Sequence, residues 1–362
     1  MISIFPSKKA KVIPELLQAS DLDAQKGITQ SDVEKLYRLL LNRAPESQEV
    51  IDSYLNADKS LSELVEIIVN SSEFSGLMES NVSHAQSASS IPDHLLHSPL
   101  VLGIYDLLIE GVVHRRVGES KNPLNKFGRK VFSQSDEDGI TLEICQRMGL
   151  QNGFYCEFGV GNGLECNTLL LASMQWQGFW IGGEQLAFSV QEVSNRKFSY
   201  LQEWVTSKNV YTLYQKGLHN LGREQVDVLS FDLDGNDLFF VDTLLQNGVK
   251  PKLFIVEYNA RFIPPIRWSV ALDDNHVWDY TDYSGASLQS FVDLFNQYGY
   301  TLVCCNAHSG VNAFFVLNEQ LQHFQDIPKD INDIYMSPNY KIYHAYAHPV
   351  SVKTVLRIFS TL

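Results

Sequence analysis

Cysteines, basic residues and long apolar runs are all scarce in this sequence, and each scarcity excludes a class of protein. The five cysteines include no CxxC pair, so they predict a reducing compartment rather than a disulfide framework. The 28 basic residues are outnumbered by 42 acidic ones and form no basic stripe, which argues against a nucleic-acid partner. No apolar run approaches the ~18 residues that a membrane span needs.

Charged residues are also few, at 19% against the roughly 25% usual in globular proteins. Hydrophobic residues make up 44%, enough for a sizeable core, which excludes wholesale disorder and collagen-like or coiled-coil architectures. A chain of 362 residues is long for one compact unit and predicts a large domain with a smaller one. At the N-terminus the lysines follow a very short apolar stretch, unlike a secretory signal, so we expect a cytoplasmic protein.

The first 78 residues have the periodicity of short amphipathic helices. Apolar residues at 33, 36, 37, 40 and 41 predict a helix over 31–43, a second helix follows Pro45, and a third covers 60–74. Residues 79–90 hold a single large apolar side chain, Val82, and predict a linker. We therefore expect a helical N-terminal domain at residues 1–78 and a second domain at residues 91–362.

From residue 153 onward, short β-rich runs alternate with helical segments. Most runs are too apolar for half-exposed strands, which is typical of the parallel strands of a doubly wound sheet. We therefore expect an α/β sandwich around a seven-stranded, mostly parallel sheet. The expected helices lie at 140–148, 164–174, 185–203, 238–247 and 286–298. The expected strands lie within 153–161, 178–184, 209–217, 226–235, 252–259, 300–307 and 312–318.

The first expected strand runs into a glycine-rich turn. Gly159, Gly161 and Gly163 let the backbone pass close to a ligand at the carboxyl edge of the sheet. The preceding Glu157 makes this an acid-x-GxGxG pattern, which differs from the GxGxxG of dinucleotide sites and occurs in enzymes that bind S-adenosylmethionine (SAM). Glu184, at the end of the second strand, can accept hydrogen bonds from both ribose hydroxyls. The alternatives are a turn without a ligand and a surface acid.

Acidic residues gather after the fourth and fifth strands. Asp232 and Asp234 point to one face of an extended backbone, and Asp237 follows them. Glu257 and Asn259 share a face at the end of the next strand by the same period of two. Crowded carboxylates raise one another's pKa or recruit a cation, so these oxygens could hold a hard cation such as Mg²⁺. The alternative is a set of polar strand ends bonded to loop amides.

Other polar segments are weaker candidates. Residues 133–139 (SQSDEDG) fit a cap for the following helix. His308 follows the sixth strand, where a structural role competes with a place in the pocket. Residues 260–285 predict either a substrate lid or core packing, because they hold His276 and the aromatic residues Trp268, Trp278, Tyr280 and Tyr283.

Seven collinear segments resemble the FkbM-type SAM-dependent methyltransferases over roughly residues 130–317. They are SQSDEDGI, FYCEFGVGNGLECNT, WQGFWI, VDVLSFDLDGNDLFFV, FIVEYNARF, YSGASL and NAFFV. The resemblance implies a Rossmann-like methyltransferase core in which the glycine turn and the acid after the second strand hold SAM. Carried over residue by residue, it implies a site lined by Gln134, Glu157, Gly159, Gly161, Asn167, Glu184, Asp232 and Asp234.

Two further resemblances concern the acids and the N-terminus. Residues 234–237 with Glu257 are similar to metal-dependent macrocin-type sugar O-methyltransferases, which use a His as base. In this sequence Asp237 stands at the position of that His, and Asn259 replaces an acid. Residues 36–37 (LY), 42–45 (NRAP) and 71–74 (SSEF) resemble a small domain of bacterial surface and glycan-related proteins, which implies docking to a partner or glycan.

The sequence thus predicts a SAM-dependent O-methyltransferase whose acceptor is a sugar hydroxyl of a surface polysaccharide or of a glycosylated small molecule. SAM and Mg²⁺ are the expected cofactors. Asp234, Glu257 and Asn259 are the expected metal ligands, and Asp237 or His308 is the expected base. Two rivals stay open: an N-methyltransferase, and a non-catalytic glycan-associated scaffold on a degenerate methyltransferase fold. A homo-oligomer stays open as well.

Overall fold

The computed structural model describes residues 29–41, 43–57, 112–189, 197–278, 281–339 and 352–360, and the single residues 64, 67, 68, 71 and 73. The chain divides into two compact units, Met1–His114 and Arg115–Leu362. The linker expected at residues 79–90 lies outside the described residues, so the domain limits expected from the sequence stay predictions.

The described part of the first unit is helical. Helices α2 (Gln30–Leu41) and α3 (Gln48–Leu55) confirm the first two expected helices, while most of the third lies outside the described residues. Arg43 forms ion pairs with Glu46 and Glu73, which joins the NRAP and SSEF segments of the N-terminal resemblance. The small core consists of Val33, Leu36, Tyr37, Leu41, Ile51, Leu64 and Ile68.

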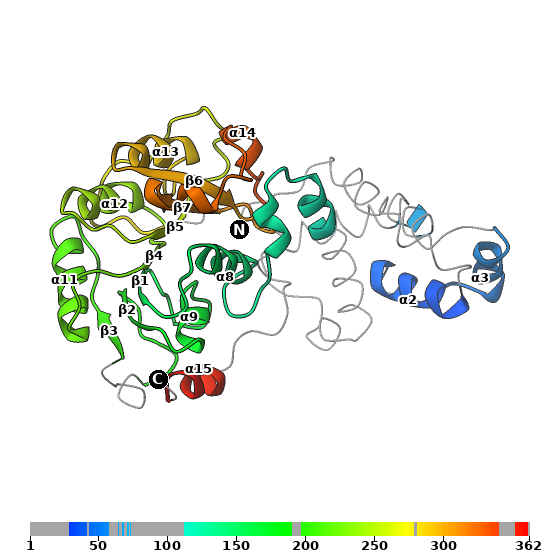
Figure 1. The fold of residues 1–362 in the computed structure, drawn as a ribbon. Coiled ribbons are helices and arrows are strands. Elements are labelled where there is room, and N and C mark those ends of the chain that lie inside the picture. Colours follow the sequence, from blue (N-terminus) through cyan, green and yellow to red (C-terminus); the bar gives the residue numbers. More distant parts are fainter. Residues whose placement is uncertain are drawn as a thin grey trace. The chain divides into compact units, whose positions relative to one another are not determined.

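The second unit is built on a seven-stranded sheet, which confirms the expected α/β class (Figure 1). The strand order is β3-β2-β1-β4-β5-β7-β6. Strands β1 to β5 pair in parallel, and β7 runs antiparallel to both β5 and β6. This is the Rossmann-like doubly wound arrangement with one reversed strand. The strands are β1 (Phe154–Phe158), β2 (Gln177–Gly182), β3 (Phe198–Gln202), β4 (Val228–Phe231), β5 (Leu253–Glu257), β6 (Tyr300–Cys305) and β7 (Asn312–Leu317).

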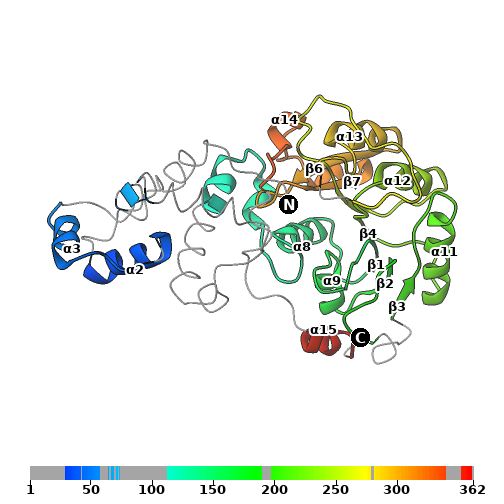
Figure 2. The same ribbon diagram turned by 180° about the vertical axis from the view of Figure 1, so that it is seen from behind.

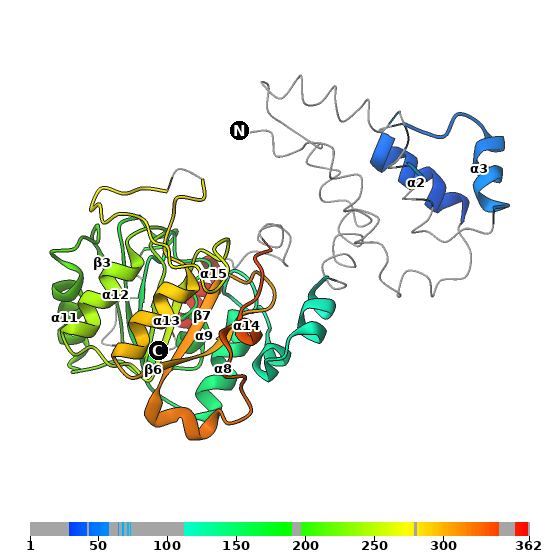
Figure 3. The ribbon, with the colours of Figure 1, turned by 90° about the horizontal axis from the view of Figure 1, so that it is seen from above.

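Helices cover both faces of this sheet. One row holds α11 (Val210–Leu221), α12 (Asp237–Gln246) and α13 (Leu288–Gln297), and the other side holds α8 (Glu137–Arg147), α9 (Leu169–Ser173) and α15 (Val352–Ser360) (Figure 2). Seen from above, α11 and α12 lie at the left of the second unit, and α8 and α14 (Ile331–Ile334) lie at its right (Figure 3). The described part of the unit also contains the short elements η2 (Pro123–Phe127) and η3 (Asn318–His323), and a helix covers residues 112–119, across the boundary between the two units.

Two of the expected elements are wrong. Of residues 209–217, expected as a strand, all but the N-cap Asn209 belong to helix α11, and the expected helix at 185–203 contains strand β3. The buried residues Val210, Leu213 and Tyr214 follow the helical period, which here outweighs a composition rich in β-branched and aromatic residues. Gly217 lets this helix approach the sheet, since a Cβ there would lie 2.2 Å from the Phe179 ring.

Candidate functional site

The carboxyl ends of β1 and β4 meet where the strand order changes direction. The chain runs outward from β1 through β2 to β3 and then places β4 on the other side of β1. Phe158 near the end of β1 pairs with Phe231 at the end of β4, so the loops after both strands begin side by side. Open α/β sheets bind ligands in the crevice beyond such a point, which makes these loops the candidate site.

The turn after β1 contains three glycines whose φ angles lie in the left-handed region. Gly159, Gly161 and Gly163 have φ angles of 83°, 50° and 82°. A Cβ on Gly159 would lie 1.4 Å from the carbonyl oxygen of Asp232, and one on Gly163 would lie 2.9 Å from Cδ2 of Leu186. The close approach of the Asp232 backbone requires glycine at position 159, and at position 163 the positive φ favours glycine. A Cβ on Gly161 would meet nothing within 4 Å, so the middle of the turn presents bare backbone to open space.

Glu157 and Asn167 lie together and fix the shape of this turn. The buried Glu157 carboxylate accepts hydrogen bonds from the backbone N–H groups of Asn167 and Thr168, both at 2.8 Å. The Asn167 amide donates to the hydroxyl of Ser230 on β4. Burial raises the pKa of Glu157 to about 7. Both side chains thus form hydrogen bonds to other groups of the protein, and a contact of either with a cofactor stays a prediction.

Beyond β2 the chain turns outward at Gly183 and Glu184, which are both exposed. Trp204 follows β3 and packs over Gly183, where a Cβ would lie 2.9 Å from Cε3 of the indole. More than half of Trp204, 53%, is exposed. A hollow of about 520 Å³ opens nearby, lined by residues 185–189 with Tyr200 and Gln202. Glu184 therefore directly follows the glycine that Trp204 covers, and Gly182, one residue before that glycine, lies against Val160 of the glycine turn.

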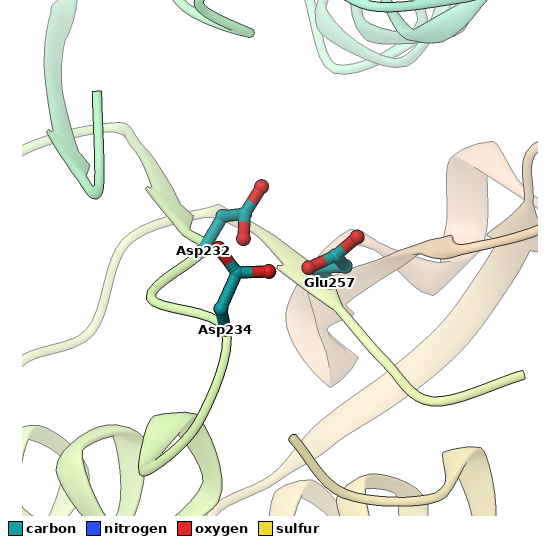
Figure 4. Close-up of side chains that lie close together, drawn as sticks. All are labelled: Asp232, Asp234 and Glu257. Atoms are coloured by element: carbon teal, nitrogen blue, oxygen red, sulfur yellow. The ribbon is translucent and has the colours of Figure 1, made fainter. Parts of the chain in front are cut away.

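Asp232, Asp234 and Glu257 direct their carboxylates toward one another (Figure 4). The two aspartates come from the loop after β4, and Glu257 ends β5. One oxygen from each of the three lies within 4.8 Å of the others, and this is the group among the described residues that could hold a metal ion. Asp234 has a φ of 56°, a strained conformation for a residue other than glycine that is typical of functional sites.

Burial and mutual repulsion raise the pKa values of these carboxyls. Burial and the charge of Glu257 raise the pKa of Asp232 well above its usual range. Burial and the charge of Asp234 raise the pKa of Glu257 to about 8, and burial with the charge of Asp237 raises that of Asp234 to about 6. Three repelling carboxylates suit a hard divalent cation, because its charge would favour their ionised forms.

Asn259 and Asp237 are both bonded to nearby backbone groups. The Asn259 amide donates to the carbonyls of Asp282 and Ser284, both at 2.9 Å, and its Oδ1 accepts from the backbone N–H of Arg261 at 3.2 Å, so its role as a metal ligand stays a prediction. Asp237 is 1% exposed and accepts from two backbone N–H groups of its own turn, at 2.7 and 2.8 Å. These bonds fix the turn between β4 and α12.

His308 belongs to a second, buried polar cluster beside α8. Its Nε2 lies 3.8 Å from an oxygen of Asp136, and its backbone N–H donates to the same carboxylate. The Asn306 amide donates to both Asp136 and Glu137. These contacts fasten the loop between β6 and β7 to α8. Gln134 is half-buried in the turn before this helix.

His276 is the residue at this site that the sequence did not single out as a catalytic group. Its ring lies against Gly235, where a Cβ would be 2.3 Å from Cδ2 of the imidazole. Its Nε2 is buried and has no hydrogen-bond partner in the described part of the chain. When protonated, the ring opposes the rise in pKa that burial causes at Asp234. The only sequence signal for this residue is its place in an aromatic-rich segment.

Residues 260–285 border the carboxyl ends of the strands. Trp278 and Tyr283 are 38% and 49% exposed, which excludes core packing for both. Trp268 is half-buried and stacks on Phe262 at a centroid distance of 4.2 Å. Tyr280 lies outside the described residues. The exposed aromatic rings make this segment part of the surface near the carboxylates.

Comparisons with known proteins add little to this geometry. The sequence matches no family model and no curated protein. Among solved structures, it is similar to a chain in the crystal structure of the fibrillarin/Nop5p complex, with 11% identity over 46% of this chain and 72% of that chain. The TM-score of 0.26 is too low to support an inference. No helix within the described ranges has both the length and the apolar character to cross a membrane.

Proposed function

We propose that this protein is a SAM-dependent methyltransferase that methylates a hydroxyl group, with a sugar of a surface polysaccharide or of a glycosylated small molecule as acceptor. The observation that carries the proposal is the turn around Gly161, whose bare backbone faces open space at the switch point of a doubly wound sheet. Its acid-x-GxGxG form favours SAM over a dinucleotide.

The residues around the turn fit SAM. The backbone at Gly161 would lie along the cofactor, and the exposed Glu184 would accept hydrogen bonds from the ribose hydroxyls. Trp204 offers an indole face beside Glu184. When bound, SAM would supply a methyl group carried on a positively charged sulfur. The acceptor oxygen would bond to the methyl carbon while the carbon–sulfur bond breaks and its electron pair stays on sulfur. The carboxylates of Asp232, Asp234 and Glu257 would favour the positive charge of the sulfonium.

The chain's own residues then have two tasks: to hold the acceptor hydroxyl in line and to accept its proton. Asp237 and His308, the bases expected from the sequence, are 1% and 3% exposed. The Asp237 carboxylate accepts from backbone N–H groups, and the His308 imidazole lies 3.8 Å from the Asp136 carboxylate. The proposal therefore assigns the proton to Asp234, which is more exposed to solvent than the other two carboxyls of its group and is only partly desolvated, and whose pKa of about 6 allows it to be ionised near neutral pH.

A divalent cation such as Mg²⁺ also fits the three carboxylates. Asp232, Asp234 and Glu257 would hold it, whereas the sequence predicts Asn259 in place of Asp232. Asp234 would then be a ligand and not the proton acceptor. When bound, the cation would lower the pKa of an acceptor hydroxyl and orient it.

A sugar acceptor is supported by the surface next to the carboxylates. Trp278 and Tyr283 expose flat aromatic faces, which can cover the apolar faces of a sugar ring. Carboxylates accept hydrogen bonds from hydroxyl groups, and amides both accept hydrogen bonds from them and donate hydrogen bonds to them. The N-terminal resemblance to glycan-related proteins points the same way.

Calorimetry with S-adenosylhomocysteine (SAH) and transfer of labelled methyl groups from SAM test the proposal. We expect a micromolar dissociation constant for SAH, which corresponds to a binding free energy of about −8 kcal/mol. Glu184→Ala should weaken binding at least about tenfold, since it removes a hydrogen-bonded charge. Glu224→Ala is the matched control, because Glu224 is an exposed glutamate before β4, at the opposite edge of the sheet.

The acceptor panel consists of neutral monosaccharides, their methyl glycosides and amino sugars. Methylation of neutral sugars on oxygen supports the proposal. Methylation confined to the nitrogen of amino sugars would favour the N-methyltransferase instead. The absence of SAH binding up to millimolar concentration would leave the non-catalytic scaffold.

A further inference from the structure

Asp274 joins the loop after β3 to the segment between β5 and α13. Its carboxylate accepts hydrogen bonds from the backbone N–H of Ser207 at 2.6 Å and from the Ser207 hydroxyl at 2.9 Å. Its backbone carbonyl accepts from the indole N–H of Trp204 at 2.9 Å. These three bonds, here called the Asp274 clamp, fasten two loops that lie far apart in the sequence.

The neighbours of Asp274 reach the turn after β4. The Asn236 amide donates to the carbonyl of Asp273 at 2.7 Å and accepts from its backbone N–H at 3.1 Å. The same carbonyl accepts from the backbone N–H of His276 at 2.9 Å. The His276 ring lies against Gly235, the residue that follows Asp234. Residues 273–276 are therefore held between the loop after β3 and the carboxylate side of the site.

Trp204 links the clamp to the proposed cofactor site. Its indole packs over Gly183, directly before Glu184, while 53% of the side chain remains exposed. If Glu184 binds the ribose, the nucleoside lies beside this indole and covers part of its surface. The indole N–H is committed to Asp274 at the same time. One side chain thus touches both the cofactor position and the clamp.

We infer that the Asp274 clamp couples cofactor binding to the acceptor side of the site, with Asp274 as a positioning residue. The inference rests on the proposed function, because it takes SAM as the ligand at Glu184. A nucleoside that fixes the Trp204 indole restricts Asp274 and, through it, residues 268–278. These residues are then in place before the acceptor arrives, so SAM binds first and the acceptor second. By linkage, the acceptor strengthens SAM binding by the same factor, on the order of fivefold or more.

Hydrogen exchange of the full chain, with and without SAH, tests this coupling without knowledge of the acceptor. In the wild type, SAH is expected to slow exchange at the glycine turn and also, on the order of fivefold, at residues 268–278. Asp274→Ala removes the two side-chain bonds of the clamp. This variant keeps the bond from the Trp204 indole to the backbone carbonyl of residue 274, so it is expected to bind SAH, to keep the slowing at the glycine turn and to reduce it at residues 268–278.

Two further variants control the experiment. Asp282→Ala changes an exposed aspartate of the same segment, which pairs with Arg261 at 3.3 Å, and should behave as the wild type does. Ser207→Ala removes one bond of the clamp and keeps the backbone bond, so it should reduce the slowing at residues 268–278. It carries the test if Asp274→Ala does not fold.

The outcomes separate this inference from the proposed function. Equal exchange at residues 268–278 with and without SAH in the wild type would overturn the coupling. Slowing that survives unchanged in Asp274→Ala and Ser207→Ala would overturn it as well. The absence of any heat when the wild type is mixed with SAH would instead refute the proposed function, and the coupling with it.

Discussion

The imidazole of His276 lies so close to Gly235 that a Cβ at position 235 would stand 2.3 Å from its Cδ2 atom. This contact brings the segment between β5 and α13 against the turn after β4, and it exists because residue 235 has no side chain. Gly235 is not among the described residues with positive φ, so the need for glycine comes from this close approach and not from the backbone conformation.

Gly235→Ala should therefore displace His276 and its segment while the backbone of the turn tolerates the change. We expect methyl transfer to fall by about tenfold to a hundredfold, since small misplacements of groups near the reacting atoms have effects of that order. SAH affinity, measured by calorimetry, should stay close to that of the wild type. Gly118→Ala is the control, because a Cβ there meets nothing within 4 Å. Full activity of Gly235→Ala would show that the position of His276 is unimportant.

Glu257→Gln should change how stability depends on pH. Burial and the charge of Asp234 raise the pKa of Glu257 from 4.5 to about 8. Between these values the folded protein holds a proton that the unfolded chain has released, so the stability of the wild type falls as the pH rises through this range. Glutamine has no such proton. Thermal unfolding in EDTA should show the variant gaining stability relative to the wild type as the pH approaches about 8. A difference that is independent of pH would contradict the raised pKa.

Mg²⁺ should bind the wild type and raise its melting temperature, because binding to the folded state alone stabilises it. Asp234→Asn should weaken this binding at least about tenfold by removing a charged ligand. Asn259→Ala should leave the affinity for Mg²⁺ unchanged, since the Asn259 amide is bonded to loop carbonyls. Calorimetry measures the affinities, and methyl transfer with EDTA and added Mg²⁺ measures the effect on turnover. Full activity in EDTA would remove the cation from the proposal.

Limited proteolysis should separate the two units. The sequence predicts a first cut between residues 79 and 92. The boundary between the units after residue 114 lies within a helix at residues 112–119, where cleavage is not expected, and mass spectrometry of the fragments locates the cut. The C-terminal fragment should bind SAH as the full chain does, because every residue of the proposed cofactor site lies in the second unit. Loss of SAH binding upon cleavage would show that the site depends on the first unit.

Most of the sheet could be predicted because its strands are buried on both faces and appear as short apolar runs. All four residues of β4 are buried, and every residue of β5 and of β7 except the last is buried. The prediction failed at β3 and α11, on the edge of the sheet. There Val210, Leu213 and Tyr214 carried the helical period, but the β-branched and aromatic composition of the segment suggested a strand.

The candidate site could be predicted in part. The adjacency of β4 and β5 was enough to bring Asp232 and Asp234 near Glu257, although both aspartates lie beyond the end of β4 at Phe231, where the period of two used for the prediction does not apply. Asn259 likewise lies beyond the end of β5 at Glu257. Asn259 instead turns to the carbonyls of residues 282 and 284.

The sequence by itself determined the α/β class, the glycine turn and the identity of the acids at the strand ends, because strand burial and turn conformation are encoded within a few neighbouring residues. Only the tertiary structure decided that His276 lies against Gly235 and that Asp274 holds Trp204 and Ser207. These contacts join loops that are distant in the chain, and their formation depends on how the sheet brings the loops together. The spacing of residues along the chain therefore does not predict these contacts.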